Sequence, residues 1–266
     1  MKGFVKTIRT TSNFWIIFSM KKSNKDAKIL FRDGSSLRLN WSQYWKVRDV
    51  LLAGYKVDQL DNDLFRIHDS KITLIGSSDM LRSLIEQVGF YNLDIYQDKI
   101  VLDIGGFQGE SAVLFWKMGA KMIVVYEPVP EHQEIIKQNM SLNNVKSEMH
   151  EAGVGSLDSV KIISYETTDL GFGNDDNGPN ELQIRIQNIA SVINESHANV
   201  AKFNCEGAEE SLVDVPSEVL RKIDFYIIMA HTPEISKAII NKLTFSGFSL
   251  FKANKKRSFL CFKKLP

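Results

Sequence analysis

The sequence has few of the residues that mark special structural classes. Its 266 residues include only two cysteines, Cys205 and Cys261, and each lies in an apolar, strand-like run. Two cysteines in such places form neither a disulfide framework nor the paired spacing of a zinc site. We therefore expect buried, reduced thiols, no bound metal and a cytoplasmic location, because reduced cysteines are typical of that compartment.

The sequence also lacks an excess of charge. It carries 33 Lys and Arg against 32 Asp and Glu, a net charge of +1. Such a balance gives no reason to expect nucleic acid as a partner.

Long hydrophobic runs are missing as well. The apolar stretch from Asn13 to Met20, NFWIIFSM, is too short to span a bilayer, and no cleavage site follows it, so we expect no integral membrane segment. An aromatic helix with basic flanks can lie on a membrane surface. The other interpretation is a helix packed on its own domain or on the partner subunit of a homo-oligomer, and we take this packing as the expectation.

A G-x-G-x-x-G dinucleotide motif is absent too. In its place, residues 99–128 read KIVLDIGGFQGESAVLFWKMGAKMIVVYEP. The pattern predicts a strand ending near Asp103, a glycine loop, a helix, and a second strand that ends at Glu127. This succession is one half of a nucleotide-binding α/β sheet.

The spacing of the glycines selects among nucleotide ligands. Phe107 occupies the place of the second glycine of a dinucleotide motif, so the backbone lacks the close approach that a pyrophosphate needs. Glu127, at the end of the second strand, is placed to accept the hydroxyls of a ribose. The stretch thus favours a ligand with a ribose and no phosphate bridge, such as S-adenosylmethionine.

The chain divides into two expected parts. Residues 1–77 contain two hairpin patterns, at 28–39 and 64–75, and a helical pattern at 42–55. We interpret them as a small α+β cap that covers part of the site and helps to select the substrate. Residues 78–266 form the nucleotide-binding domain, in which strands and helices alternate before a final hairpin.

The alternation in the second part predicts a mostly parallel sheet with one reversed strand. Strands are expected at 100–104, 122–126, 160–165, 182–187, 200–203, 225–229, 248–251 and 258–262, and 148–155 is expected to hold the third strand and the turn after it. Helices are expected at 78–90, 111–118, 131–139, 189–193, 234–243 and 211–222, the last of them broken by Pro216. The loop TTDLGFGNDDNGPN is either a flap near the substrate or a disordered hairpin tip, and Asp175 and Asp176 within it have no spacing that supports a metal site.

Several segments together resemble the FkbM-type family of S-adenosylmethionine-dependent methyltransferases. They are VLDIGGFQGES, VVYEPVPE, EAGVGS, AKFNCEGAEESL, IIMAH and SGFSLF, and the likeness runs from about Lys99 to the C-terminus. The resemblance implies a Rossmann-like class I methyltransferase fold with a seven-stranded sheet and an antiparallel terminal hairpin strand. It also implies O-methylation of a small molecule or a sugar (EC 2.1.1.-).

The candidate cofactor residues follow from the glycine stretch and from the strand ends. The glycines form the loop, Asp103 orients it or the methionine amine, Glu110 binds the same end, Glu127 takes the ribose, and Asn204 lies beside the methyl group. The full set is Asp103, Gly105, Gly106, Gln108, Gly109, Glu110, Ser111, Glu127, Pro128, Glu151, Ala152, Gly153 and Asn204.

His231 and Glu206 are the candidates for a catalytic base, because a methyl acceptor hydroxyl must lose a proton. Structural roles are the alternative for both: a helix cap for His231 and a brace of the glycine turn for Glu206. The sequence departs from the family pattern at Asn204, where the family has Asp, and at Met229, where it has an acid. These departures keep open a catalytically silent methyltransferase-like binding domain. A third hypothesis, an NAD-dependent oxidoreductase, is disfavoured by the missing glycine motif.

Overall fold

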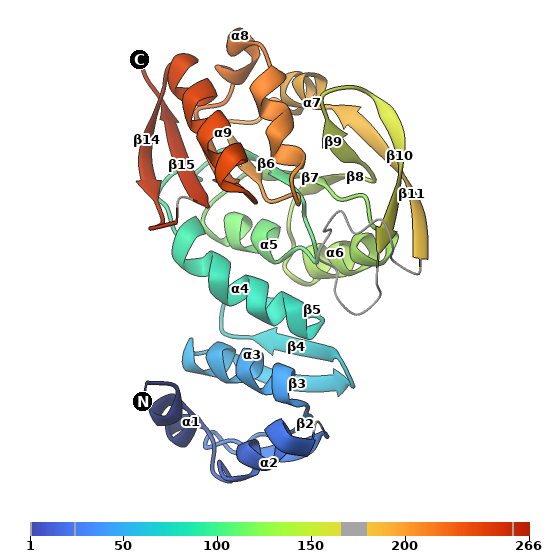
Figure 1. Cartoon of the computed structure of the whole chain (residues 1–266), viewed down its shortest axis with the longest axis vertical. Helices are drawn as coiled ribbons and strands as arrows, with labels where there is room; N and C mark the ends of the chain where they lie inside the picture. The colour runs from blue at the N-terminus through green and yellow to red at the C-terminus, as the bar shows by residue number, and fades with distance from the viewer. Residues whose placement is uncertain (1, 24, 166–179, 257) are drawn as a thin grey trace. The chain divides into compact units, whose positions relative to one another are not determined.

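The computed structural model describes residues 2–23, 25–165, 180–256 and 258–266, and it divides into two compact units. The first unit comprises Met1–Gly89 with Ser141–Asn143, and the second comprises Phe90–Met140 with Asn144–Pro266. The elements of the first unit are α1 (Lys2–Thr10), α2 (Ile16–Ser23), β1 (Ala27–Leu30), β2 (Ser36–Leu39), α3 (Trp41–Leu52), β3 (Lys56–Asp61), β4 (Leu64–His68), β5 (Thr73–Gly76) and most of α4 (Ser78–Tyr91) (Figure 1).

Helix α3 organises the first unit. Asn40 caps it, accepting a hydrogen bond from the Gln43 N–H while the Gln43 side chain accepts one from the Asn40 N–H, a reciprocal capping box. Its apolar positions bury Tyr44 and Val47 completely, and α3 contacts α1, α2, β2 and β3. The expected hairpins are confirmed as β1–β2 and β4–β5, both antiparallel, whereas α1 and the partner strand β3 went unpredicted.

The second unit is built on one large sheet. Its remaining elements are β6 (Ile100–Ile104), α5 (Glu110–Lys117), β7 (Met122–Tyr126), α6 (Pro130–Leu142), β8 (Ser147–His150), β9 (Gly153–Gly155), β10 (Ser159–Tyr165), β11 (Asn180–Asn188), α7 (Ile189–Ser196), β12 (Val200–Phe203), the 3₁₀-helix η1 (Ala208–Asp214), α8 (Ser217–Leu220), β13 (Phe225–Met229), α9 (Pro233–Phe245), β14 (Phe248–Ala253) and β15 (Phe259–Lys264). The large sheet has seven strands in the order β14-β15-β13-β12-β6-β7-β8.

The direction of the strands confirms the expected fold class. Strands β8, β7, β6, β12 and β13 pair in parallel, while β15 runs antiparallel to both β13 and β14. This is the Rossmann-like, seven-stranded sheet with a reversed strand in its terminal hairpin that the resemblance to class I methyltransferases implies.

Both faces of the large sheet are covered, as a mostly parallel sheet requires. Leu102 and Ile104 of β6 pack with residues of α7, η1, α8 and α9, whereas Val101 packs with α5 and α6 on the opposite face (Figure 1). Side chains alternate along a strand, so Asp103 lies on the same face as Val101. The buried acid therefore points towards the side that carries α5.

The strand order reverses between β6 and β12. The chain moves outward from β6 through β7 to β8, and then returns to start again at β12 on the other side of β6. Ligands of open α/β sheets bind at such a switch point, beyond the carboxyl ends of the strands. The glycine loop after β6 and the turn after β12 both begin there.

Two predictions for the second unit differ from the structure. The strands at 160–165 and 182–187 are confirmed as β10 and β11, but they form a separate small sheet with β9. The break expected at Pro216 within the helical stretch 211–222 is confirmed, but the part before it is the 3₁₀-helix η1 and only the part after it, α8, is an α-helix. The candidate flap, with Asp175 and Asp176, lies outside the described residues.

Within the described ranges, no helix is long and apolar enough to cross a membrane. The same part of the chain holds no cluster of three or more His, Cys, Asp or Glu side chains suited to a metal ion.

The tight approach of the two loops at the switch point can be tested at Gly105. Its φ is +79°, and an added Cβ would lie 2.0 Å from the carbonyl oxygen of Asn204. Gly105→Ala should lower the free energy of unfolding by about 2–5 kcal/mol, since it adds a clash with backbone to a left-handed conformation. Urea unfolding followed by circular dichroism measures this.

Gly207→Ala is the matched control for that substitution. Gly207 also has a positive φ, +101°, but no atom lies within 4 Å of the added Cβ. It should lose only about 1–2 kcal/mol, the cost of the left-handed conformation alone. Equal losses for the two variants would contradict the close contact between Gly105 and Asn204.

Candidate functional site

The loop from Gly105 to Gly109 joins β6 to α5 and is held by the neighbouring strand. The N–H groups of Gly105 and Gly106 both donate to the carbonyl oxygen of Tyr126, at 2.9 and 3.1 Å. An added Cβ on Gly106 would lie 2.4 Å from Cγ1 of Val125, so the side of the loop facing β7 is filled by protein. The glycines are thus required by internal packing, whatever the loop binds.

Asp103 lies at the centre of a fully buried ion pair. Its Oδ1 is 2.7 Å from Nζ of Lys202 on β12, and its Oδ2 accepts a hydrogen bond of 2.6 Å from the Ser111 hydroxyl. Lys202 also donates to the carbonyl oxygen of Gly105 at 2.6 Å. Of the two roles expected for Asp103, this geometry matches the one that orients the glycine loop.

The residues that follow the loop are also buried. Glu110 is completely buried in the first turn of α5, where a carboxylate is favoured by the helix dipole. The carbonyl oxygen of Gln108 accepts a hydrogen bond of 2.7 Å from the Asn139 side chain of α6. The start of α5 is therefore fixed from two sides.

Glu127 has both carboxylate oxygens engaged within the protein. Oε2 accepts from the Phe107 N–H at 2.9 Å, and Oε1 accepts from the Val129 N–H at 3.1 Å, with Nδ1 of His132 3.3 Å away. The side chain is only 4% exposed. The expected ribose acid thus links β7 to the glycine loop, and binding of a ribose at Oε2 would require the turn at Phe107 to move.

Three predicted cofactor residues follow β8: Glu151 is exposed, Ala152 is buried and Gly153 is half-buried. Glu151 is exposed and lies 3.3 Å from Nζ of Lys137, while Ala152 is buried in the core. Gly153 starts β9, and its added Cβ would lie 3.8 Å from Pro128, so these two predicted residues are close together. The structure therefore gathers the strand ends of β6, β7 and β8, as predicted.

The turn after β12 is organised by Glu209, which the sequence analysis did not single out. Glu209 is completely buried, and its Oε2 accepts from the Gly207 N–H at 2.9 Å. Its Oε1 lies 2.8 Å from Nδ1 of His231 and accepts from the His231 N–H at 3.0 Å. The other ring nitrogen of His231 is 3.3 Å from Glu206, so the structure brings both candidate bases together.

The charges of this cluster set its protonation. Burial of the His231 ring opposes its charged form, but hydrogen bonds to Glu206 and Glu209 and their negative charges prevail and raise the pKa of His231 to about 10. Burial likewise opposes the charge of Glu209, yet His231 and the backbone donors keep its pKa below the usual value. At neutral pH His231 is an imidazolium, which donates protons and does not accept them.

Four residues of the site were missed: Lys202, Glu209, Phe107 and His132. A lysine inside the apolar run VAKF is a signal of a buried counter-ion, because an unpaired charge there would be costly. Phe107 has φ +49°, and its ring meets the His132 ring edge to face at 4.7 Å between centroids. No local pattern predicts that contact.

Some buried polar atoms at this sheet edge have no hydrogen-bond partner among the described residues, and two of them belong to residues beside the glycine loop and the turn after β12. These two are Oδ1 of Asn204 and Nε2 of His132. Buried polar atoms are nearly always paired, so each is a candidate to contact a ligand.

The comparisons with known proteins concern the fold. No protein-family model matches the sequence, and no curated protein matches it. Solved structures that resemble it include fibrillarin from Aeropyrum pernix with bound S-adenosyl-L-methionine (11% identity, 90% of this chain and 93% of that one, TM-score 0.43). Two others are a precorrin-6y C5,15-methyltransferase from Geobacter metallireducens (14%, 68% and 88%, TM-score 0.42) and a ribosomal protein L11 methylase from Lactobacillus delbrueckii (15%, 67% and 77%, TM-score 0.38).

Further structures in this group are named for RNA and tRNA methylation. At these identities and TM-scores, the similarities do not identify the activity, acceptor or family of this chain. The fold assignment rests on the order and direction of its own strands.

The buried ion pair can be tested by removing its cation. Lys202→Met should lower the free energy of unfolding by about 3–5 kcal/mol, because Asp103 keeps a buried charge without a partner. The double variant Lys202→Met/Asp103→Asn should be more stable than the single one, since the uncompensated charge is gone. Urea unfolding of the wild type, Lys202→Met, Asp103→Asn and the double variant measures this, and a double variant that loses the sum of the two single losses would contradict the pair.

The His231 cluster predicts a dependence of stability on pH. A pKa raised from 6.5 to about 10 in the folded state stabilises the fold fully below pH 6.5, and the contribution disappears as the pH rises through about 10. The free energy of unfolding of the wild type should therefore exceed that of His231→Gln most at pH 6–7, and the difference should shrink towards pH 10. A difference that stays constant over this range would rule out the raised pKa.

Proposed function

We propose that this chain is an S-adenosylmethionine-dependent methyltransferase that methylates a hydroxyl group of a small molecule or a sugar. The observation that carries the proposal is the meeting of the Gly105–Gly109 loop with the Asn204 turn at the switch point of the sheet. The FkbM-type sequence segments lie in these same places and support the proposal.

The bound cofactor would supply the activated methyl group, and the protein would have to orient it. Asn204 has the best placed free acceptor, because its Oδ1 is buried at the end of β12 without a partner among the described residues. His132 offers Nε2 beside Glu127 on the other side of the loop. A ligand that places a hydrogen-bond donor against Asn204 Oδ1 and a second polar group against His132 Nε2 would fit these two side chains.

Glu127 remains the candidate for a ribose, but it has a structural role as well. A carboxylate has about four acceptor positions, and two backbone donors and His132 occupy three of them, so a ribose would reach Oε2 with a movement of the turn at Phe107. Asp103 is different, because Lys202 and Ser111 occupy it and it is completely buried. We therefore propose that Asp103 shapes the loop and that Asn204 contacts the cofactor.

Of the two candidate bases, Glu206 is favoured. It is 38% exposed at the turn after β12, while His231 holds a proton at neutral pH. The positively charged His231 ring lies 3.3 Å from the Glu206 carboxylate and fixes its position. In this proposal His231 is a positioning residue and Glu206 faces the acceptor.

A catalytically silent binding domain is the second candidate. Asn204 cannot act as a base, and Met229, at the strand end where the family has an acid, packs against the core. An NAD-dependent oxidoreductase is the third and has no supporting observation in the loop.

S-adenosylmethionine should bind to the purified chain with measurable heat in calorimetry, and it should raise the melting temperature, because a ligand at 100 times its Kd adds about 2.7 kcal/mol of stability. Asn204→Ala should weaken binding about tenfold through the loss of one hydrogen bond. The matched control, Asn194→Ala on the exposed side of α7, should bind as the wild type does.

The outcomes separate the three candidates. Absence of binding, or stronger stabilisation by NAD, would exclude the proposed cofactor. Binding without transfer of labelled methyl to a panel of sugars and other hydroxyl compounds would favour the silent domain. Transfer that is lost in Glu206→Gln, with cofactor affinity unchanged, would support the proposed base.

A further inference from the structure

Charge is distributed unevenly along the chain. Residues 1–32 contain eight Lys and Arg and a single acid, Asp26, a balance of +7, while the whole chain has +1. The remaining residues therefore carry −6. The first two helices and the first strand form a strongly basic segment inside a nearly neutral protein.

Helix α2 in this segment has two different faces. Ile17 and Met20 are buried, which confirms the expected packing of this helix on its own unit. The opposite face carries Phe18, 57% exposed, and Lys22, with Trp15, 64% exposed, just before the helix. Positions 15, 18 and 22 share one side at helical spacing, so the aromatic rings and a lysine are presented together.

The adjoining strand β1 continues the basic character. Ile29 and Phe31 point inward, and Lys28 and Leu30 point outward. Lys28 lies directly opposite Arg38 of β2 in the antiparallel register. Like charges in opposed positions destabilise a sheet, and the described residues provide no carboxylate within ion-pair distance of either.

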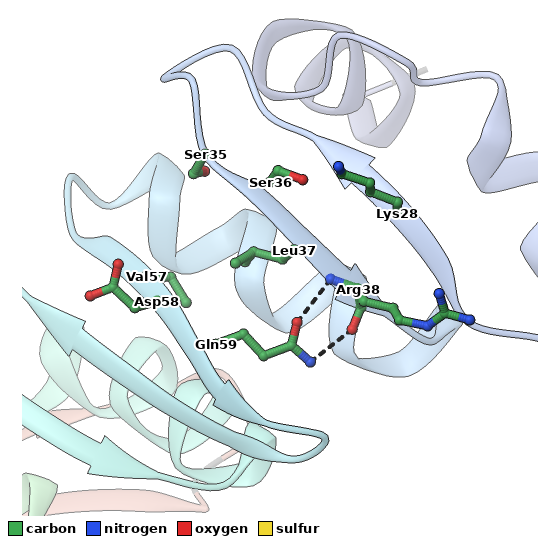
Figure 2. A pocket seen from close by; sticks show the side chains of 8 residues that line it. All are labelled: Lys28, Ser35, Ser36, Leu37, Arg38, Val57, Asp58 and Gln59. Carbon is green, nitrogen blue, oxygen red and sulfur yellow. Dashed lines mark hydrogen bonds between the residues drawn. The ribbon is translucent and has the colours of Figure 1, made fainter.

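A groove of about 580 Å³ lies beside this pair of cations. Figure 2 shows Lys28, Ser35, Ser36 and the Asp58 carboxylate in its lining, the Arg38 side chain directed away from the two serines, and the Gln59 amide paired with the Arg38 backbone. Asp58 is paired with Arg66 at 2.9 Å, so its charge is compensated within the protein. Cations together with hydroxyl donors suit a phosphate group. The groove thus offers a place for an anionic headgroup.

We propose that the first unit docks on the surface of a membrane containing anionic phospholipid. The surface that docks, here called the basic–aromatic face, consists of Trp15, Phe18, Lys22, Lys28 and Arg38. The two rings enter the headgroup region, where Trp is favoured, and the cations meet the negative lipids. The attraction of these cations to anionic lipid is screened by salt.

The observations favour lipid over the other partners of a basic surface. Single-stranded nucleic acid is bound by a cationic groove and by aromatic rings on which bases stack, whereas an interfacial membrane surface also presents aliphatic side chains. Here Val5 and Leu30 are 47% and 42% exposed in the same segment. Aliphatic groups, aromatic rings and lysines together match the boundary between headgroups and acyl chains.

The test is sedimentation of the full chain with vesicles of phosphatidylcholine alone or mixed with phosphatidylserine. We expect binding to the mixed vesicles only, with a blue shift of tryptophan emission and a loss of binding at high salt. Trp15→Ser/Phe18→Ser should lower the partition coefficient at least tenfold. Phe245→Ser is the matched control, because Phe245 on α9 is an 85% exposed ring outside the face.

A second variant, Lys28→Gln/Arg38→Gln, tests the charges without changing the rings and should reduce binding and its salt dependence together. Circular dichroism and urea unfolding establish that each variant is folded. Failure of the wild type to bind mixed vesicles would overturn the proposal. So would tighter binding to an RNA oligonucleotide than to vesicles, or a dimer that Trp15→Ser/Phe18→Ser converts to a monomer.

Discussion

The buried ion pair between Asp103 and Lys202 is the constraint on which the candidate site depends. It joins β6 to β12, the two strands on either side of the switch point, and Lys202 also holds the carbonyl of Gly105. Removing two charges from water is expensive and is compensated only by good geometry and further hydrogen bonds. Ser111 supplies one such bond. The position of the glycine loop against the Asn204 turn, and hence any pocket between them, follows from this pair.

The other buried acids at this sheet edge also have partners that compensate their charge. Glu127 is compensated by two backbone donors and His132, and Glu209 by His231 and the Gly207 N–H. Acids that a sequence pattern assigns to a ligand therefore also hold the loops that would receive it. Because these carboxylates are engaged, the candidate atoms for recognising a ligand are Asn204 Oδ1 and His132 Nε2, which have no hydrogen-bond partner among the described residues.

The sequence predicted the fold better than the roles of its side chains. Apolar strands ending in acids and the glycine loop are local patterns, so the sheet, its reversed strand and the neighbourhood of Asp103, Glu127 and Asn204 could be predicted. The partner of Asp103 could not, because Lys202 lies on a strand far along the chain and only pairing of β6 with β12 brings them together. The break at Pro216 could be predicted, but the 3₁₀ conformation of η1 before it could not, because helical spacing does not distinguish a short 3₁₀-helix from an α-helix. Strand β3 was missed because its polar sequence, KVDQLD, lacks clear alternation.

Averages over the chain can also conceal a local property. The net charge of +1 gave no reason to expect a polyanionic partner. The net charge of the whole chain describes each part of its surface only if the charges are evenly distributed. Here the first 32 residues hold +7, and electrostatic attraction acts over about one Debye length, roughly 8–10 Å, so distant acids do not cancel it. The expectation that the NFWIIFSM helix packs on its own unit was correct for Ile17 and Met20, but a helix has two sides. The exposed side, with Trp15, Phe18 and Lys22, is the one proposed to contact anionic lipid.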